Sequence, residues 1–491
     1  MSPNWESCTI ENNSAHIANQ AKSPWFWVPT LYFVEGVPYV LVNTISVALF
    51  AKFGVPNDQL AFFTTLLYFP WFLKGIWSPV VDVVKTKRWW IIAMQVLMTI
   101  LCALLVVTLP HPDATLIADK QTPVSIFWLT LVLFIITAFA SATHDIAADG
   151  YYMLAQSVDS QARFVGIRST FYRIATIFGQ GGLVAVAGMV ENKTDNIPLS
   201  WQVAIGTAAV ILCLTTLYHL FALPKVEENY PTSNIQHPTS ILKAFSTFFT
   251  KPGAWLAILF MLLYRLPEGL LVKLSFPFLV DSPETTVRNG QIFGGGLGLS
   301  TLDVSLIYGM FGVAFLLLGG ILGGLYISRR GLRRSLWLMA AFLTVPNFVY
   351  VYLSAAQPTN LWIIGSAISL EQFGYGFGFT AYMMYMMHFS QSGQKLASDT
   401  SSEAQNIAAS DMQNIATSDT QDYATSHYAI CTAFMALSMM LPGFVAGKIE
   451  LAVGYNAFFW IAIACSVTTV FVTYFVRKSL VKNDRYTIDI R

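Results

Sequence analysis

Long apolar runs separated by short polar loops constrain the fold of this chain more than any other feature. A helix that crosses a lipid bilayer needs roughly 20 mostly apolar residues, and twelve such runs follow one another along the 491 residues. Only 11% of the residues are charged, whereas about a quarter are charged in an average soluble domain. We therefore expect an all-α, polytopic membrane protein with twelve transmembrane helices, embedded in a lipid bilayer.

The twelve runs form two groups of six with a polar linker between them. The expected spans are 24–53, 59–80, 89–109, 123–151, 166–190 and 201–223, followed by 255–280, 302–327, 335–354, 361–389, 425–449 and 455–476. The predicted domains are an N-terminal tail (1–23), a six-helix bundle (24–223), a linker (224–252), a second six-helix bundle (253–480) and a C-terminal tail (481–491). The polar segment 391–426 contains an eight-residue repeat (QNIAASDM, QNIATSDT, QDYATSHY). Segments this polar do not build a core, so we interpret it as a cytoplasmic insertion.

The distribution of basic residues predicts the orientation in the membrane. With the N-terminus in the cytoplasm, 19 of the 28 lysines and arginines fall on the inner side, 5 on the outer side and 4 within spans. Lys and Arg are enriched in cytoplasmic loops, so both termini are predicted to be cytoplasmic. The net charge of +1 gives no reason to expect a nucleic-acid partner. No cysteine pair has metal-ligand spacing and no nucleotide-binding glycine loop is evident, so we expect neither a metal nor a cofactor.

Five ionisable residues lie deep in the predicted spans. At about 1.5 Å of rise per residue, Glu35 and Arg173 are roughly 15 Å deep and Arg265 and Glu268 roughly 18 and 22 Å deep, with Glu371 close to the midplane. Charges at such depth are costly unless they pair or line a wet cavity. Because both halves contribute, we expect one shared level, where the two arginines hold an anionic substrate and a glutamate carries a coupling proton. The sequence does not choose among the three glutamates, and simple pairing across helices is the alternative.

Two further sets of residues are candidates for binding and gating. Tyr32, Tyr39 and Tyr375 lie deep enough to stack on a sugar, although most membrane tyrosines form interface belts. A second set of charges lies nearer the cytoplasm and is predicted to close an inner gate through ion pairs: Lys74, Asp82, Asp145, Asp149, Arg163 and Arg168. Static pairing at helix ends is the alternative for this set.

Six spans, a linker and six more spans resemble the plan of the major facilitator superfamily, whose substrate site lies between the two halves. The basic loop GGLYISRRGLRR (323–334) resembles that superfamily's loop signature. Several stretches resemble the AmpG-type permeases of the superfamily: FVEGVPYVL (33–41), WSPVVD (77–82), SATHDIAADGY (141–151), Arg163 with Gly166 and FYR (171–173), YRLPEGL (264–270), Glu371, and PGFVAGKIE (442–450). Two positions depart from the family: Glu268 replaces an expected Asp, and Glu35 replaces a small or polar residue.

The resemblance implies proton-driven import of anhydro-muropeptides, which are cell-wall breakdown products, across a bacterial inner membrane. It further implies a monomer that takes an amphiphilic anionic small molecule and is not an enzyme. Related permeases carry siderophores or acetyl-CoA, so these remain alternative substrates. A non-transporting sensor, with the insertion as its output, is another alternative. A membrane enzyme with Asp145, Asp149 and His144 as metal ligands is disfavoured, because His144 points about 100° away from Asp145 on the helix.

Overall fold

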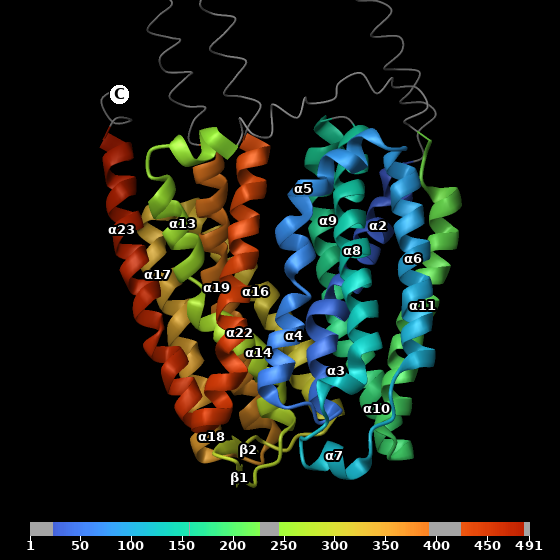
Figure 1. Ribbon diagram of the computed structural model, residues 1–491. Helices are drawn as coiled ribbons and strands as arrows, with labels where there is room; N and C mark the ends of the chain where they lie inside the picture. The colour runs from blue at the N-terminus through green and yellow to red at the C-terminus, as the bar shows by residue number, and fades with distance from the viewer. Residues whose placement is uncertain (1–22, 157, 226–244, 392–423, 486–491) are drawn as a thin grey trace, which may run out of the picture.

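The computed structural model describes residues 23–156, 158–225, 245–391 and 424–485 (Figure 1). The predicted tails, linker and repeat-containing insertion therefore lie wholly or mostly outside the described residues. The elements of the first half are η1 (Pro24–Phe26), α2 (Val28–Val40), η2 (Leu41–Ile45), α3 (Ser46–Lys52), α4 (Asn57–Leu66), α5 (Phe69–Val83), α6 (Lys87–Thr108), α7 (Ala114–Ala118), η3 (Val124–Phe127), α8 (Trp128–Leu154), α9 (Val158–Ile177), η4 (Phe178–Leu183), α10 (Val184–Thr194) and α11 (Ile197–Ala222). Those of the second half are α13 (Ala254–Leu263), α14 (Leu266–Val280), β1 (Thr286–Arg288), β2 (Gln291–Phe293), α15 (Thr301–Val304), η6 (Ser305–Gly312), α16 (Val313–Arg330), α17 (Leu332–Thr344), η7 (Val345–Asn347), α18 (Phe348–Ala356), α19 (Leu361–Gln391), α22 (Ala424–Ala464) and α23 (Ser466–Arg485).

The helices account for the expected number of membrane passes. Ten helical segments of the described chain are long and apolar enough to cross a membrane. The last of them, 427–480, is 54 residues long and turns at Gly454, where φ is 76° and ψ is 166°. The 31-residue helix α19 packs against α16 and α17 as a further pass. Counting the bent segment as two passes and α19 as one gives twelve, so the predicted fold class is confirmed.

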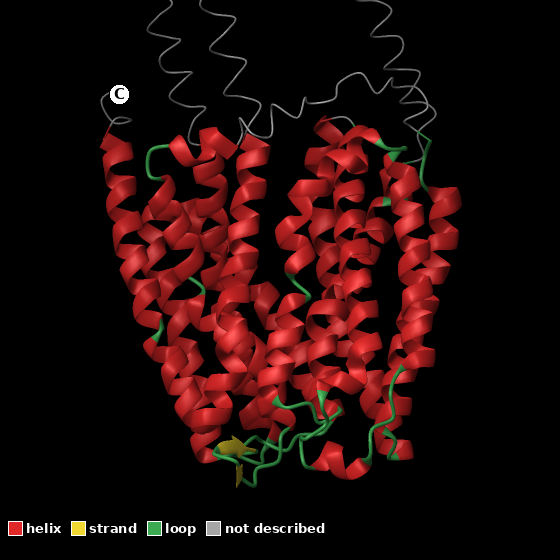
Figure 2. Cartoon of the chain, viewed as in Figure 1, coloured by secondary structure: helices red, strands yellow, loops and turns green. Residues whose placement is uncertain are grey.

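The two ends of the bundle differ. The first and last described helices, α2 and α23, begin and finish at one end, which we call the terminal end (Figure 1). The opposite end, which we call the hairpin end, carries the short helix α7 and the antiparallel hairpin β1–β2 (Figure 2). The pattern of basic residues predicts this common side for both termini, and it predicts that the terminal end faces the cytoplasm.

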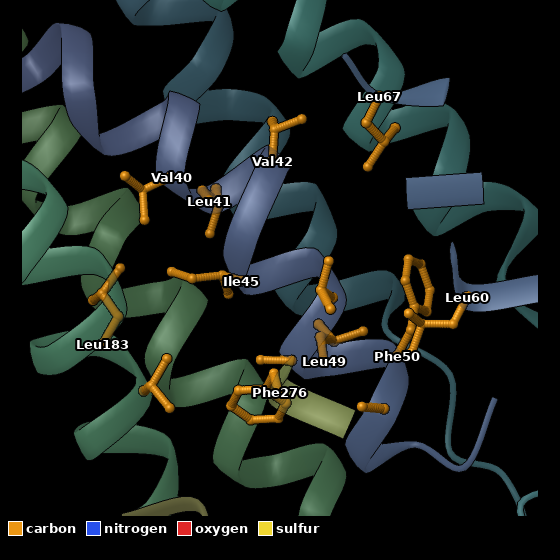
Figure 3. Packing of buried hydrophobic residues seen from close by; sticks show 14 of the residues in the cluster. Val40, Leu41, Val42, Ile45, Leu49, Phe50, Leu60, Leu67, Leu183 and Phe276 are labelled. Atoms are coloured by element: carbon orange, nitrogen blue, oxygen red, sulfur yellow. The ribbon is translucent and has the colours of Figure 1, made fainter. Parts of the chain in front are cut away.

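The two halves pack together at the hairpin end and separate toward the terminal end. One buried apolar cluster contains residues of both halves, and Figure 3 shows Phe276 of the second half beside Leu49 and Ile45 of the first. Two other clusters lie closer to the terminal end, and each belongs to one half. The cluster of the first half includes Trp27 and Leu223, and the cluster of the second half includes Phe248 and Val476. Because apolar burial stabilises roughly in proportion to its area, the described cores hold the halves together at the hairpin end.

Several spans are interrupted near their middle, and these breaks position polar residues. Arg265 separates α13 from α14 with non-helical dihedrals (φ −106°, ψ 11°), and Pro267 follows in the first turn of α14. The π-helical segments η2, η4 and η6 interrupt three other spans, and η4 contacts both η2 and η6. Such segments are frequent at functional sites. A cavity of about 60 Å³ lies among them, lined by residues of both halves that include Asn43, Gln180 and Tyr308.

Candidate functional site

Arg265 organises the polar groups of the second half. Its side chain is buried, with 5% of the residue exposed. Nε and Nη2 donate to the two carboxylate oxygens of Glu268 at 2.9 and 2.6 Å, and Nη2 also donates to the Tyr375 hydroxyl at 2.8 Å. The guanidinium lies 4.5 Å from the centre of the Phe379 ring. These contacts hold the guanidinium at the break between α13 and α14, where helical pairing at i, i+3 brings Glu268 to it.

Groups of the first half face this arginine across the space between the halves. Arg265 interacts electrostatically with Tyr39 of α2 and with Tyr68, which lies between α4 and α5. Arg173 of α9 interacts in the same way with Tyr375 of α19. These interactions place four predicted substrate residues near one another between the halves: Arg173, Arg265, Tyr39 and Tyr375. Arg173 is exposed there, and within the described residues no hydrogen bond or ion pair engages its guanidinium.

Three carboxylates of the first half form a second group, which we call the acidic cluster: Glu35 of α2 and Asp145 and Asp149 of α8. Oxygens of the three lie within 4.8 Å of one another. Lys74 of α5 pairs with Asp145 at 2.5 Å, and Arg168 of α9 pairs with Asp149 at 2.6 Å. The spacing of four between the two aspartates on α8 places both on the side that faces α2.

Tyr32 belongs to the acidic cluster and not to the inter-half space. It is fully buried, its hydroxyl donates to Asp149 at 3.2 Å, and the Arg168 guanidinium lies 4.4 Å from its ring centre. Gly36 permits this packing, because a Cβ there would lie 2.7 Å from the Cβ of Ala175 on α9. The Tyr32 ring, which was predicted to stack on the substrate, is therefore covered by other side chains of the protein in this structure.

The five deep charges do not converge on one group, contrary to the expectation from helix depth. Glu35 joins the acidic cluster, whereas Glu371 stays inside the second half, where Gln372 donates to it at 2.9 Å and Tyr350 at 3.4 Å. Depth along a helix does not define the direction in which a side chain points, so residues at one level end on different faces.

The predicted inner-gate pairs form within a single half. Lys74, Asp145, Arg168 and Asp149 all belong to the first half, so these pairs do not bridge the two halves in this structure. The side chains of Asp82 and Arg163 lie outside what the structure describes. His144 contacts Gln95 at 2.9 Å and not the acidic cluster, which agrees with the helical-angle argument against a histidine-containing metal site.

A polar network at the hairpin end joins the halves and was not predicted. Lys120, next to α7, donates to Asp281 of the second half at 2.5 Å and to Asn57 at 3.0 Å. Asn57 in turn donates to Glu450 at 2.8 Å and to Tyr455 at 2.9 Å, and Tyr455 donates to Asp281 at 2.6 Å. We call these five residues the hairpin-end network. Residues that bond within this network are up to 398 positions apart in the sequence. The sequence feature that could have indicated the network is that all five residues lie at or next to the outer ends of predicted spans.

Lys273 of α14 is a second buried polar residue that joins the halves. It is 1% exposed, donates to the Thr64 carbonyl of the first half at 3.1 Å, and lies 4.6 Å from the centre of the Tyr68 ring. This lysine of α14 therefore bridges the halves between the hairpin-end network and Arg265.

Comparisons with known proteins agree with this architecture. The profile of the Major Facilitator Superfamily matches residues 30–401. A putative transporter AmpG 4 of Rickettsia felis is 24% identical over 400 residues, covering 78% of this chain and 87% of that protein. The anhydromuropeptide permease of Escherichia coli K12 is 22% identical over 459 residues, covering 92% and 79%. These relatives confirm the resemblance to AmpG-type permeases.

Solved structures show the same fold at lower identity. The nucleoside transporter NupG is 15% identical with a TM-score of 0.61, covering 93% of this chain and 98% of its own. The inward-open xylose transporter XylE of Escherichia coli is 13% identical with a TM-score of 0.60, covering 91% and 94%. The family profile spans well over half of the sequence. This chain therefore belongs to the Major Facilitator Superfamily and is a multi-pass membrane transporter, not an enzyme.

Proposed function

We propose that this transporter imports anhydro-muropeptides across a bacterial inner membrane, driven by the proton gradient, with both termini in the cytoplasm. The observation that carries the proposal is the placement of two arginines from different halves, Arg173 and Arg265, around one space. The name of one relative, the anhydromuropeptide permease of Escherichia coli, suggests the substrate class.

The chemistry of this space suits an amphiphilic anion that contains sugar rings. Arginine binds carboxylates through paired charge-assisted hydrogen bonds, and Arg173 has its donors available for this. Tyr39 lies in an aromatic wall, with its ring 5.1 Å from that of Trp71 and 6.2 Å from that of Tyr172. A muropeptide presents both features, because its peptide carries carboxylates and its disaccharide presents flat faces for stacking.

The packing of the two halves indicates which side of the membrane this conformation serves. Substrate sites of such transporters lie near the midplane between halves that rock against each other. Here the hairpin end is closed by an apolar cluster and by the hairpin-end network, while the described cores at the terminal end are separate. With the termini in the cytoplasm, this is an inward-facing state, from which substrate leaves into the cell.

Binding to the purified protein tests the substrate class. A ligand at about 100 times its Kd adds roughly 2.7 kcal/mol to the free energy of unfolding, which a thermal denaturation assay detects. We expect GlcNAc-anhydro-MurNAc-peptide to stabilise the wild type, and Arg173→Ala to weaken that binding roughly 10- to 100-fold, because a hydrogen bond to a charged group is worth about 1.5–3 kcal/mol. Arg173→Ala leaves no partner unsatisfied, so the unliganded protein should keep its stability.

Arg288→Ala is the matched control, because this arginine lies at the hairpin end in an exposed pair with Asp119. Its muropeptide affinity should equal that of the wild type. Stabilisation by acetyl-CoA or by a ferric siderophore, with none by the muropeptide, would replace the proposed substrate. No stabilisation by any of the three would favour the sensor alternative.

A further inference from the structure

The acidic cluster holds one more negative group than positive group. Its three carboxyls, Glu35, Asp145 and Asp149, are matched by only two cations, Lys74 and Arg168. Glu35 is the carboxyl without a cation of its own. It is 7% exposed, and its Oε2 atom has no hydrogen-bond partner in the described protein. A buried carboxylate oxygen without any partner is costly in its charged form.

The other groups around Glu35 supply no additional positive charge. The elements that pack against α2 are mainly α8, α9 and α11. The charged groups beside Glu35 are Asp145 and Asp149 of α8 and Arg168 of α9, with Lys74 of α5 bound to Asp145. Arg173, the other described cation of α9, interacts with Tyr375 of the second half instead. The neutral titratable groups are Tyr32 and Tyr39 on α2 itself, Tyr152 on α8, Tyr172 on α9 and His219 on α11. His219 donates to or accepts from Thr30 and Gln95, so it belongs to a separate polar network together with His144.

A proton balances the charge of this cluster better than a metal ion does. Calcium-like cations take six or more oxygen ligands, but Lys74 already occupies Oδ2 of Asp145, while Arg168 and Tyr32 both occupy Oδ1 of Asp149. A proton needs only one oxygen and a neighbouring acceptor. Carboxyls that crowd together cannot all ionise, and they titrate as one unit with one of them neutral.

We propose that the acidic cluster binds one proton at neutral pH, shared by Glu35 with Asp145 and Asp149, and that this is the proton coupled to transport. The second part rests on the proposed function. It selects Glu35 from the three glutamate candidates, because Glu268 is bound to Arg265 and Glu371 is hydrogen-bonded inside the second half.

Exposure gives this proton a route to one side of the membrane. The Asp149 and Arg168 side chains are 38% and 31% exposed, whereas Glu35 is buried beside them. Asp149 lies one turn of α8 closer to the terminal end than Asp145 does. The exposed Asp149 carboxylate therefore links the cluster to water on the terminal side in this conformation, and a proton brought in from the other side is released here.

Counting protonated carboxyls in charge-altered variants tests the site without any substrate. Infrared difference spectra of the purified, membrane-reconstituted protein measure the carbonyl stretch of neutral carboxyls against pH. If the number of protons equals the acids minus the cations, Glu35→Gln, Asp145→Asn and Asp149→Asn should each remove one protonated carboxyl at neutral pH. Lys74→Met should add one, and the double variant Lys74→Met/Glu35→Gln should return to the wild-type number. Glu284→Gln, which changes an exposed carboxyl, should leave the count unchanged.

The double variant keeps the test decisive if Lys74→Met alone does not fold, because it has the same charge balance as the wild type. An unchanged count in Glu35→Gln overturns the proposal, and so does loss of the neutral carboxyl signal when sodium chloride replaces choline chloride at constant pH, since the site would then hold sodium. The spectra measure protonation and do not depend on transport. A protein that passes this test but takes up no muropeptide would refute the proposed substrate and leave the proton site standing.

Discussion

Replacing Arg265 with alanine is expected to abolish uptake. The guanidinium is buried, binds both oxygens of Glu268 and donates to Tyr375, so its loss removes a positive charge from the substrate space and disorders two of its neighbours. Truncating one member of a buried, hydrogen-bonded charge pair costs roughly 2–5 kcal/mol, which corresponds to about 30-fold to several-thousand-fold in affinity. Uptake of labelled substrate by cells with equal amounts of membrane-inserted protein measures this loss.

A double variant separates a binding role of Arg265 from a purely structural one. Arg265→Ala alone leaves Glu268 with an unpaired carboxylate, whereas Arg265→Ala/Glu268→Ala removes both charges and should regain folding stability, because the cost of breaking a buried pair comes mostly from the charge left behind. If Arg265 binds the substrate, the double variant is stable but inactive. Recovery of uptake in the double variant, or normal uptake by Arg265→Ala, would show that the arginine only neutralises Glu268.

Removing Lys120 should open the hairpin end. Lys120→Met leaves Asp281, which is 5% exposed, without its cation, and removes a donor to Asn57. Loss of one partner of a buried ion pair costs about 3–5 kcal/mol, which would favour the outward-facing state by roughly 100-fold or more. The readout is the rate at which Thr44→Cys, on a background without the native cysteines, reacts with a membrane-impermeant thiol reagent added to whole cells. Thr44 lines the cavity between the halves, so we expect faster labelling in Lys120→Met.

The pair of Arg288 with Asp119 is the matched control for Lys120. It also joins the two halves at the hairpin end, with an N–O distance of 2.9 Å, but its side chains are 34% and 53% exposed. Exposed pairs contribute about 0–1 kcal/mol, so Arg288→Met should label at nearly the wild-type rate. Equal labelling of wild type, Lys120→Met and Arg288→Met would show that the apolar packing alone keeps this end closed.

The parts of the site that depend on local spacing were predictable from the sequence. The twelve apolar runs predict twelve membrane-spanning helices, because a run of about 20 apolar residues satisfies its own backbone hydrogen bonds within lipid by forming a helix. Arg265 and Glu268 pair because residues three apart on a helix are neighbours. The grouping of Lys74 and Arg168 with the α8 aspartates followed from a shared depth at helix ends, and the structure places these residues together.

The parts that depend on helix direction and on long-range register were not predictable. The depth calculation groups Glu35 with Arg265 and Glu268, whereas in the structure α2 turns this residue toward Asp145 and Asp149 of α8. The hairpin-end network links Asn57 with Tyr455 across 398 positions. Its geometry depends on close helix contacts such as that of Gly447, where a Cβ would lie 2.0 Å from the Asn57 carbonyl oxygen.

Uptake of labelled GlcNAc-anhydro-MurNAc-peptide into proteoliposomes, with and without a proton gradient directed into the vesicles, tests the central claim most directly. The vesicles should contain protein inserted in the native orientation, and the Arg265→Ala/Glu268→Ala variant serves as the inactive control. We predict accumulation above the external concentration only when the gradient is present. Absence of accumulation from protein that is shown to be folded and inserted, or accumulation that ignores the gradient, would contradict the account of a proton-coupled muropeptide importer.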